Sequence, residues 1–339
     1  MDVRRTKRAF RRRRTLPRVG PGKRSKAVSP LLHGRTALCG GLLLSSLAAF
    51  QDSSPEDTRP PHERIDLPSI AACGGCHEKV FREWAESLHS RAWTNENARV
   101  ATRDFQKKSC RPCHSPRSVF ETGFDRAPAY RDFNQRDGVH CLSCHGLDDG
   151  VAAARTIPDA PCRPRREPRL IQAEHCYPCH EPTHGAFAEY RTSDAFALGV
   201  RCVDCHMQPR PEGDGRSHGS HGGLNPDFVR RAIAWEAERT DGAIELRVRN
   251  RTGHRFPGEI PSRAFLIRMD LPGHETQSVL LRKPFRGEKR EDNRLRPDEE
   301  RTFQFPLPRG GESARLRLLF QPFPLLPVEE SFLLGEKTL

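Results

Sequence analysis

The stretch CGGCHEKVFREWAESLH, from Cys73 to His89, opens with two cysteines separated by two residues and a histidine directly after the second. The same Cys-x-x-Cys-His pattern occurs five times, and it takes up ten of the twelve cysteines in the 339-residue chain. Chance would produce the pattern about 0.02 times in a chain of this composition. The five copies are CGGCH (73–77), CRPCH (110–114), CLSCH (141–145), CYPCH (176–180) and CVDCH (202–206).

This spacing suits the covalent attachment of haem. Two thiols on one tight turn can each add to a vinyl group of one haem, and the adjacent histidine then ligates the iron. Zinc knuckles and short disulfides also use paired cysteines, but neither requires a histidine after every pair. We therefore predict five covalent haem c groups. The predicted attachment residues are Cys73, Cys76, Cys110, Cys113, Cys141, Cys144, Cys176, Cys179, Cys202 and Cys205, and the predicted proximal ligands are His77, His114, His145, His180 and His206.

The haems must also supply much of the core of this region. The five motifs lie within the 134 residues from Cys73 to His206, which leaves about 27 residues for each haem, too few for a separate hydrophobic core. The hydrophobic content of the whole chain is only 35%. We predict a mostly α-helical, loop-rich domain over residues 73–239, in which the haems pack against one another.

Histidines outside the motifs are candidates for the second axial ligand. Only Met207 and Met269 are available as thioether ligands after the leader, so ligation by two histidines is expected for most haems. Such irons have lower potentials than His/Met irons and no open coordination position, which favours electron transfer. The candidates from the sequence alone are His89, His140, His175, His184, His218 and His221.

An internal repeat singles out His89. The segments FREWAESLH (81–89) and FAEYRTSDA (187–195) share the pattern Phe-x-Glu-aromatic-x-x-Ser, each shortly after a haem motif. Both are predicted to be helices with the two aromatic residues on one face, as parts of a duplicated unit. The last position is His89 in one copy and Ala195 in the other. We predict that His89 ligates a haem other than that of its own motif, although an ordinary polar role is the alternative.

The remaining candidates have weaker signals. His140 and His175 each directly precede a motif cysteine and could point only at a neighbouring haem, while His184 follows its motif by four residues. His218 and His221 lie in the glycine-rich EGDGRSHGSHGG, which either reaches back to a haem or serves as a flexible linker.

The N-terminal region predicts export. Residues 1–35 hold thirteen Lys and Arg residues and one acidic residue, and the apolar run ALCGGLLLSSLAAF (37–50) follows. We predict a basic leader and signal peptide over 1–50 and a linker over 51–72, with an uncleaved anchor as the alternative. The charge after Arg35 is nearly balanced, so we expect no nucleic-acid partner. No later stretch is long enough to span a membrane, so a periplasmic or otherwise exported protein is predicted.

The C-terminal region changes to a period of two. AIELRVRN (243–250) and ARLRLLF (314–320) alternate apolar and polar residues, which predicts strands. We predict an antiparallel, β-sandwich-like domain over 240–339. The preceding NPDFVRRAIAWEAERTDG (225–242) is predicted to be a helix.

The run from about residue 60 to 235 resembles the cytochrome c-552/c-554 family of multihaem cytochromes. The resemblance rests on the first motif with EWAESLH, on GVHCLSCHG (138–146), and on FAEYRTS leading into GVRCVDCHM (199–207). It implies a helical, loop-rich fold with closely packed haem pairs, and a ligand at His89 for a haem from a later motif. NRTGHRFPGEIPSR (250–263) is similar to an element that accompanies such cytochromes, which implies that His254 ligates a haem; a histidine bonded within a hairpin is the alternative.

Two functions fit these observations. The first is electron transfer through five haems between redox partner proteins of the periplasm, with no catalytic residues. The second is catalysis on a small nitrogen or sulfur compound at one haem with an open axial position. The chain has only three tyrosines and no lysine in place of a proximal histidine, so electron transfer is favoured.

Overall fold

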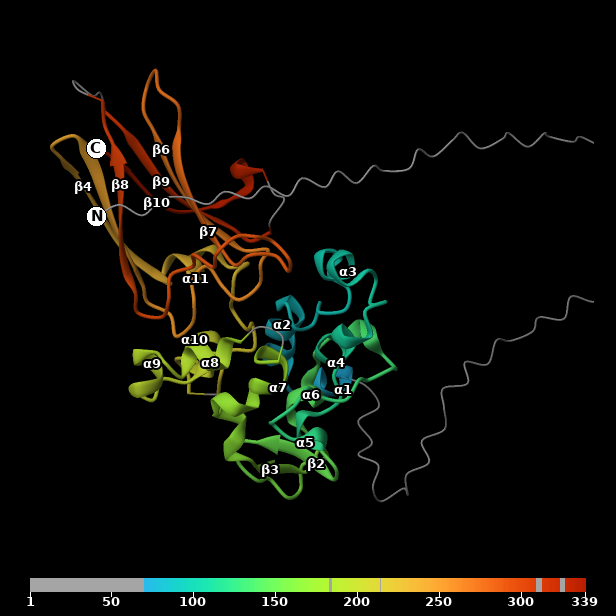
Figure 1. Ribbon diagram of the computed structural model, residues 1–339. Helices are drawn as coiled ribbons and strands as arrows, with labels where there is room; N and C mark the ends of the chain where they lie inside the picture. The colour runs from blue at the N-terminus through green and yellow to red at the C-terminus, as the bar shows by residue number, and fades with distance from the viewer. Residues whose placement is uncertain (1–69, 183–184, 214, 309–312, 324–326) are drawn as a thin grey trace, which may run out of the picture. The chain divides into compact units, whose positions relative to one another are not determined.

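The computed structural model describes residues 70–182, 185–213, 215–308, 313–323 and 327–339 (Figure 1). The predicted leader, the predicted signal peptide and His184 lie outside these residues. Within the described residues, no helix is long and apolar enough to cross a membrane.

Short helices and long connections make up the region that carries the motifs. The second cysteine of each motif lies in a short helix, and the first cysteine lies in the same helix or directly before it. The helices are α1 (Ile70–Cys76), α2 (Glu78–Glu86), α3 (Glu96–Thr102), α4 (Arg111–His114), α5 (Val119–Thr122), α6 (Cys141–His145), α7 (Tyr177–His180), α8 (Ala186–Tyr190), α9 (Asp194–Ala197), α10 (Cys202–His206) and α11 (Pro226–Arg230). The 3-10 turns are η1 (Lys108–Cys110), η2 (Gln135–Asp137), η3 (Pro168–Ile171), η4 (Ala173–His175) and η5 (Val328–Glu330).

The two repeat segments are both helical at their start, as predicted, but both helices end earlier than expected. In each copy the serine hydroxyl donates a hydrogen bond back to the carbonyl of the aromatic residue three positions before, Ser87 to Trp84 at 2.6 Å and Ser193 to Tyr190 at 2.7 Å. Such a bond competes with the helical hydrogen-bond pattern. As a result His89 lies in the turn after α2, not on the helix itself.

The repeat extends to the way each helix is attached to a later motif. The Trp84 indole N–H donates to the carbonyl of Val139 at 2.8 Å, and the Tyr190 hydroxyl donates to that of Val200 at 2.7 Å. Val139 and Val200 stand at the same place, two residues before the first cysteine of their motifs. The duplication is therefore one of structure as well as of sequence.

A small sheet between the third and fourth motifs was not predicted. Its strands are β1 (Gly146–Leu147), β2 (Gly150–Ala153) and β3 (Pro164–Arg166), with β2 in the middle. The strands are too short to give a periodic sequence signal, since the longest has four residues.

The C-terminal region consists of antiparallel strands, as predicted. One sheet has the order β10-β9-β6-β7 and the other β4-β5-β8. Their bounds are β4 (Ile233–Thr240), β5 (Ala243–Asn250), β6 (Ala264–Asp270), β7 (Gln277–Arg282), β8 (Glu300–Pro306), β9 (Arg315–Gln321) and β10 (Phe332–Thr338). Alternation is visible in the burial of β5, where Ile244, Leu246 and Val248 are fully buried.

The predicted helix over 225–242 is wrong for most of its length. Only Pro226–Arg230 is helical, and β4 begins at Ile233 and pairs with β5 along its whole length. Ala and Glu favour a helix in this segment, but Ile233 and Ala237 also alternate with polar residues, and pairing with β5 buries both. The predicted domain boundary at 240 therefore falls at the end of the first strand.

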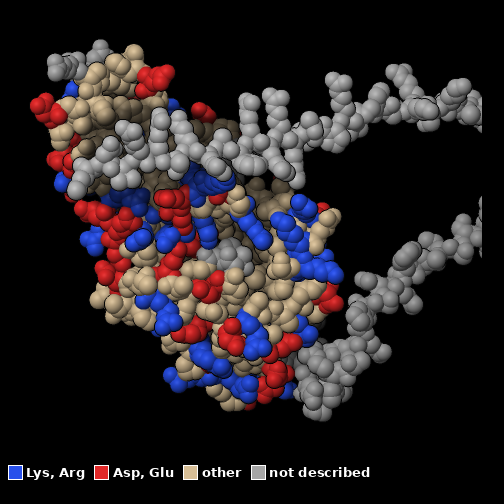
Figure 2. Space-filling view, in the orientation of Figure 1, with Lys and Arg blue, Asp and Glu red and all other residues tan. Residues whose placement is uncertain are grey.

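The hydrophobic cluster of the protein belongs to the sheets. Nineteen buried apolar residues between Val229 and Leu334 form one cluster, to which strands of both sheets contribute. Among the described residues between 70 and 225, five aliphatic or aromatic residues are buried, namely Phe105, Val119, Ala152, Ala173 and Val203, together with four prolines. On the face seen in Figure 2, basic and acidic side chains are interspersed, in keeping with the nearly balanced charge of the chain after its leader.

Candidate haem sites

None of the ten motif cysteines forms a disulfide, so every one of these sulfur atoms is available for haem attachment. Cysteine side chains of different motifs also lie next to one another, and these contacts join the first motif to the third, the second to the fourth and the fourth to the fifth. The pairs are Cys73 with Cys141, Cys113 with Cys179, and Cys176 with Cys202. These pairs form two groups of neighbouring sites, one of the first and third motifs and one of the second, fourth and fifth.

Three proximal histidines face a histidine from elsewhere in the chain. With metal–nitrogen bonds of about 2 Å and imidazole radii of about 1.1 Å, two histidines on one metal ion have ring centroids about 6 Å apart. The three pairs have this separation: His180 and His89 at 6.3 Å, His145 and His218 at 6.1 Å, and His206 and His254 at 6.3 Å. The spacing fits an iron between the two rings of each pair.

The proximal rings are oriented by backbone carbonyls. Nδ1 of His114 donates to the carbonyl of Ala92 at 2.6 Å, and Nδ1 of His145 donates to that of Ala152 in β2 at 2.7 Å. A proton on Nδ1 leaves the lone pair on Nε2 free for a metal, and the hydrogen bond fixes the ring plane. The small sheet thus has a role at the third motif.

The facing rings are in the form that ligates iron. Burial lowers the pKa of His218 and of His254 to about 4, so both are neutral at neutral pH. Burial also lowers the pKa of His89, His145 and His206. A neutral imidazole is the metal-binding species, so these rings need not lose a proton to bind.

His218 and His221 in the glycine-rich loop have different surroundings. Nδ1 of His218 donates to the carbonyl of Arg216 at 2.9 Å, which leaves Nε2 for the side of His145. His221 instead braces the backbone of the fifth motif, because its N–H donates to the carbonyl of His206 and its carbonyl accepts from His206 Nδ1 at 2.6 Å. The Nδ1 atom of His221 accepts a hydrogen bond from Asn225.

His140 caps the helix of the third motif. Its Nδ1 accepts a hydrogen bond from the backbone N–H of Ser143 at 3.1 Å, and the Ser143 hydroxyl accepts one from the backbone N–H of His140. A neutral imidazole whose Nδ1 accepts a hydrogen bond carries its proton on Nε2, so neither nitrogen has a free lone pair. The equivalent place in the fifth motif is taken by Arg201, which forms a similar box with Asp204.

His175 is buried without a polar partner. Neither ring nitrogen has a hydrogen bond within the described part of the chain, and Phe120 and Phe124 lie with their ring centroids 5.6 Å from its own. Burial lowers the pKa of His175 to about 4. An unpaired buried imidazole is costly unless a ligand satisfies it, so His175 fits the chemistry of a haem ligand.

His254 is presented by a loop between β5 and β6 that Asn250 organises. The fully buried Asn250 donates from Nδ2 to the carbonyls of His254 and Arg296, both at 2.8 Å, and accepts the N–H of Thr252 at 2.9 Å. The preceding Gly253 packs on α8, since a Cβ there would lie 3.1 Å from the Tyr190 ring. The hydrogen bonds of Asn250 and the close packing at Gly253 account for the Asn and the Gly of the NRTGH sequence.

Replacing Asn250 should destabilise the holoprotein. Asn250→Ala leaves the N–H of Thr252 without its partner and removes one donor from each of the two carbonyls, so we expect the free energy of unfolding to fall by about 2 kcal/mol. Denaturant unfolding of the haem-loaded protein measures the loss, and the exposed β8 variant Gln304→Ala is the control. Equal midpoints for the two variants would show that Asn250 does not hold the loop.

The sequence analysis missed the groups that hold the histidine loops. Asn250 is one, and the others are Glu83 and Glu189, which stand at the same position of the two repeats. The shared Phe-x-Glu-aromatic pattern contained the signal, but the carboxylate partners lie more than 60 residues away.

Comparisons with known proteins agree with the motifs and the fold. Residues 72–146 match the model of the family described as cytochrome c554 and c-prime. The structure is similar to that of a penta-heme cytochrome c552 from Thermochromatium tepidum, with a TM-score of 0.62 and 19% sequence identity, over 83% of this chain and 100% of that chain. A comparison with curated proteins gives no match. The segment that holds the first three motifs thus matches a family of c-type cytochromes, and the chain shares its fold with a penta-heme cytochrome.

Proposed function

We propose that the chain is an exported electron carrier with five covalent haem c groups, of which at least three are ligated by two histidines. The match to a family of c-type cytochromes favours electron transfer, and the number and ligation of the haems are the finer part of the proposal. The protein similar in fold carries five haems according to its description, which agrees with the five motifs here.

The proposed ligands follow the three imidazole pairs. His218 serves the haem of the third motif, His89 that of the fourth and His254 that of the fifth, each opposite the proximal histidine of that motif. His175 is the proposed ligand of a further haem, because its buried ring nitrogens have no other partner within the described residues. We leave His140 and His221 out, since Nδ1 of each accepts a hydrogen bond.

The proposed function assigns a role to the motif cysteines and a role to the paired histidines. The motif thiols hold the haems, and the paired imidazoles keep substrates from three of the irons. Bound haem iron supplies one-electron redox chemistry at a potential set by its ligands and burial. The cysteines of neighbouring motifs lie next to one another, which places haem sites close enough to support transfer from site to site.

The three imidazole pairs are the observation that carries the proposal, because such pairs leave no open axial position at their sites. The proposal also includes export, redox partners in the periplasm and a sandwich arrangement of the two C-terminal sheets. The leader lies outside the described residues, so export rests on the sequence alone.

Counting haems and electrons tests this function. We expect the intact mass of the purified protein to equal a chain that begins near Ala49 to Gln51 plus five haems. A reductive titration should take up five electrons per chain, and nitrite, hydroxylamine or sulfite should not reoxidise the reduced protein in a catalytic cycle. Fewer haems, or turnover with one of these compounds, would contradict an electron carrier of this kind.

A further inference from the structure

The glutamate of each repeat lies between a buried arginine and a histidine loop. In the first copy, Oε2 of Glu83 accepts the backbone N–H of His218 at 2.8 Å. The same carboxylate accepts two hydrogen bonds from Arg210, at 2.6 Å from Nη2 and 3.2 Å from Nε. The side chain of Arg210 is only 6% exposed, so this ion pair is shielded from water.

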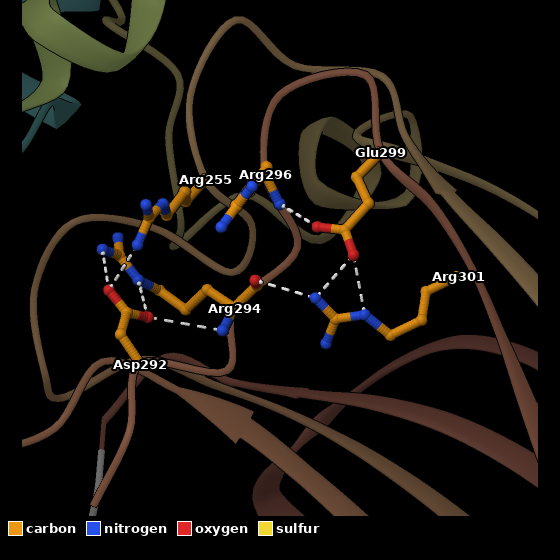
Figure 3. Close-up of a pocket in the computed structure, with 6 residues that line it drawn as sticks. All are labelled: Arg255, Asp292, Arg294, Arg296, Glu299 and Arg301. Atoms are coloured by element: carbon orange, nitrogen blue, oxygen red, sulfur yellow. Dashed lines mark hydrogen bonds and ion pairs between the residues drawn. The ribbon is translucent and has the colours of Figure 1, made fainter.

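The second copy repeats the arrangement with different partners. Oε2 of Glu189 accepts the backbone N–H of Arg255, the residue after His254, at 2.8 Å. Its Oε1 atom lies 3.4 Å from Nη2 of Arg294, whose side chain is 2% exposed, and 3.3 Å from Nε of Arg255. Asp292 binds the guanidinium groups of both arginines and so fixes their positions (Figure 3).

The two carboxylates thus act at equivalent places on different loops. Each stands on the repeat helix one residue before the aromatic side chain that fastens the helix to a later motif. Each accepts an N–H at or next to a histidine that faces a proximal ligand. The loops themselves are far apart in sequence and unrelated in secondary structure, since one follows α10 and the other joins two strands.

We propose that Glu83 and Glu189 are positioning residues that fix His218 and His254 as distal ligands of the third and fifth haems. The inference rests on the ligand pairs of the proposed function. A histidine on a loop rich in glycine has many conformations, and a charge-assisted hydrogen bond from a helix removes most of them. The buried arginines aim each carboxylate at its loop through their ion pairs.

Spin state reports the position of the histidine directly. In Glu189→Ala the ratio of detached to attached His254 should rise by about tenfold or more, the effect of losing one charge-assisted hydrogen bond. Low-temperature electron paramagnetic resonance should then show high-spin iron at one haem, and added imidazole should restore the low-spin signal. Glu83→Ala should give the same change at a different haem.

Matched variants separate positioning from general stability. Glu189→Gln keeps an oxygen that accepts the N–H of Arg255, so it should remain largely low-spin although its ion pair with Arg294 is lost. Glu86→Ala removes an exposed carboxylate from the same helix as Glu83 and should change nothing. If Glu189→Ala fails to retain five haems, Glu189→Asp, with its carboxylate withdrawn by one methylene, should show the high-spin signal instead.

The outcomes distinguish this inference from the proposed function. If His218→Ala and His254→Ala each produce one high-spin haem but neither glutamate variant does, the ligand pairs stand and the positioning role is wrong. If the histidine variants also leave the spectrum unchanged, the ligand pairs are wrong and the positioning role falls with them.

Discussion

Without haem, the full chain should keep its C-terminal strands and lose ordered structure from residue 70 to about 225. The cluster of nineteen buried apolar residues lies entirely between Val229 and Leu334. In the described part of the motif region, the buried apolar residues are five aliphatic or aromatic residues, two of them alanines, and four prolines. Burial on that scale does not offset the conformational entropy of so long a segment.

Hydrogen exchange measures this directly. A full-length variant with alanine at the ten motif cysteines should exchange the amides of α2, α6 and α10 within seconds, while β5, β6 and β9 remain protected as in the haem-loaded protein. The haem-loaded protein should protect both regions. Slow exchange in α6 of the haem-free variant would show that the polypeptide folds this region alone.

Replacing His254 should convert one haem of five to the high-spin state while all five remain attached. The ring of His254 lies 6.3 Å from that of His206, the separation expected for two histidines on one iron. Attachment depends on Cys202 and Cys205, so the haem count should not change. Magnetic circular dichroism in the near infrared distinguishes bis-histidine from high-spin iron and should lose one bis-histidine band.

Two other histidine variants serve as controls for this experiment. His274→Ala changes an exposed turn of the C-terminal region and should leave every haem unchanged. His221→Ala removes the imidazole ring but keeps the backbone carbonyl of His221 that accepts the hydrogen bond from His206. The haems should therefore remain low-spin. A high-spin haem in His221→Ala together with an unchanged spectrum in His254→Ala would exchange their proposed roles.

The sequence predicted the parts of the structure that have a local signal. The five motifs follow from spacing alone, and β5 and β9 follow from the alternation of Ile244, Leu246 and Val248 and of Leu316, Leu318 and Phe320. The repeat predicted that α2 and α8 are helices and singled out His89, whose ring lies beside that of His180.

The sequence could not predict what depends on contacts between distant segments. Which histidine faces which motif is set by the fold, as His89 and His180 are 91 residues apart. The strand β4 was missed because pairing with β5 outweighs the helical preference of its Ala and Glu residues. The role of His140 as a cap depends on the rotation of its ring toward Ser143. The spacing of residues in the sequence does not indicate that rotation.

The central claim is that His89, His218 and His254 each ligate a haem of a distant motif. Low-temperature electron paramagnetic resonance of the triple alanine variant, with high-spin iron counted per chain and haem content checked by intact mass, tests it most directly. We expect three more high-spin irons than in the unaltered protein, one from each single variant, with five haems still bound. An unchanged spin count in the triple variant would contradict the account.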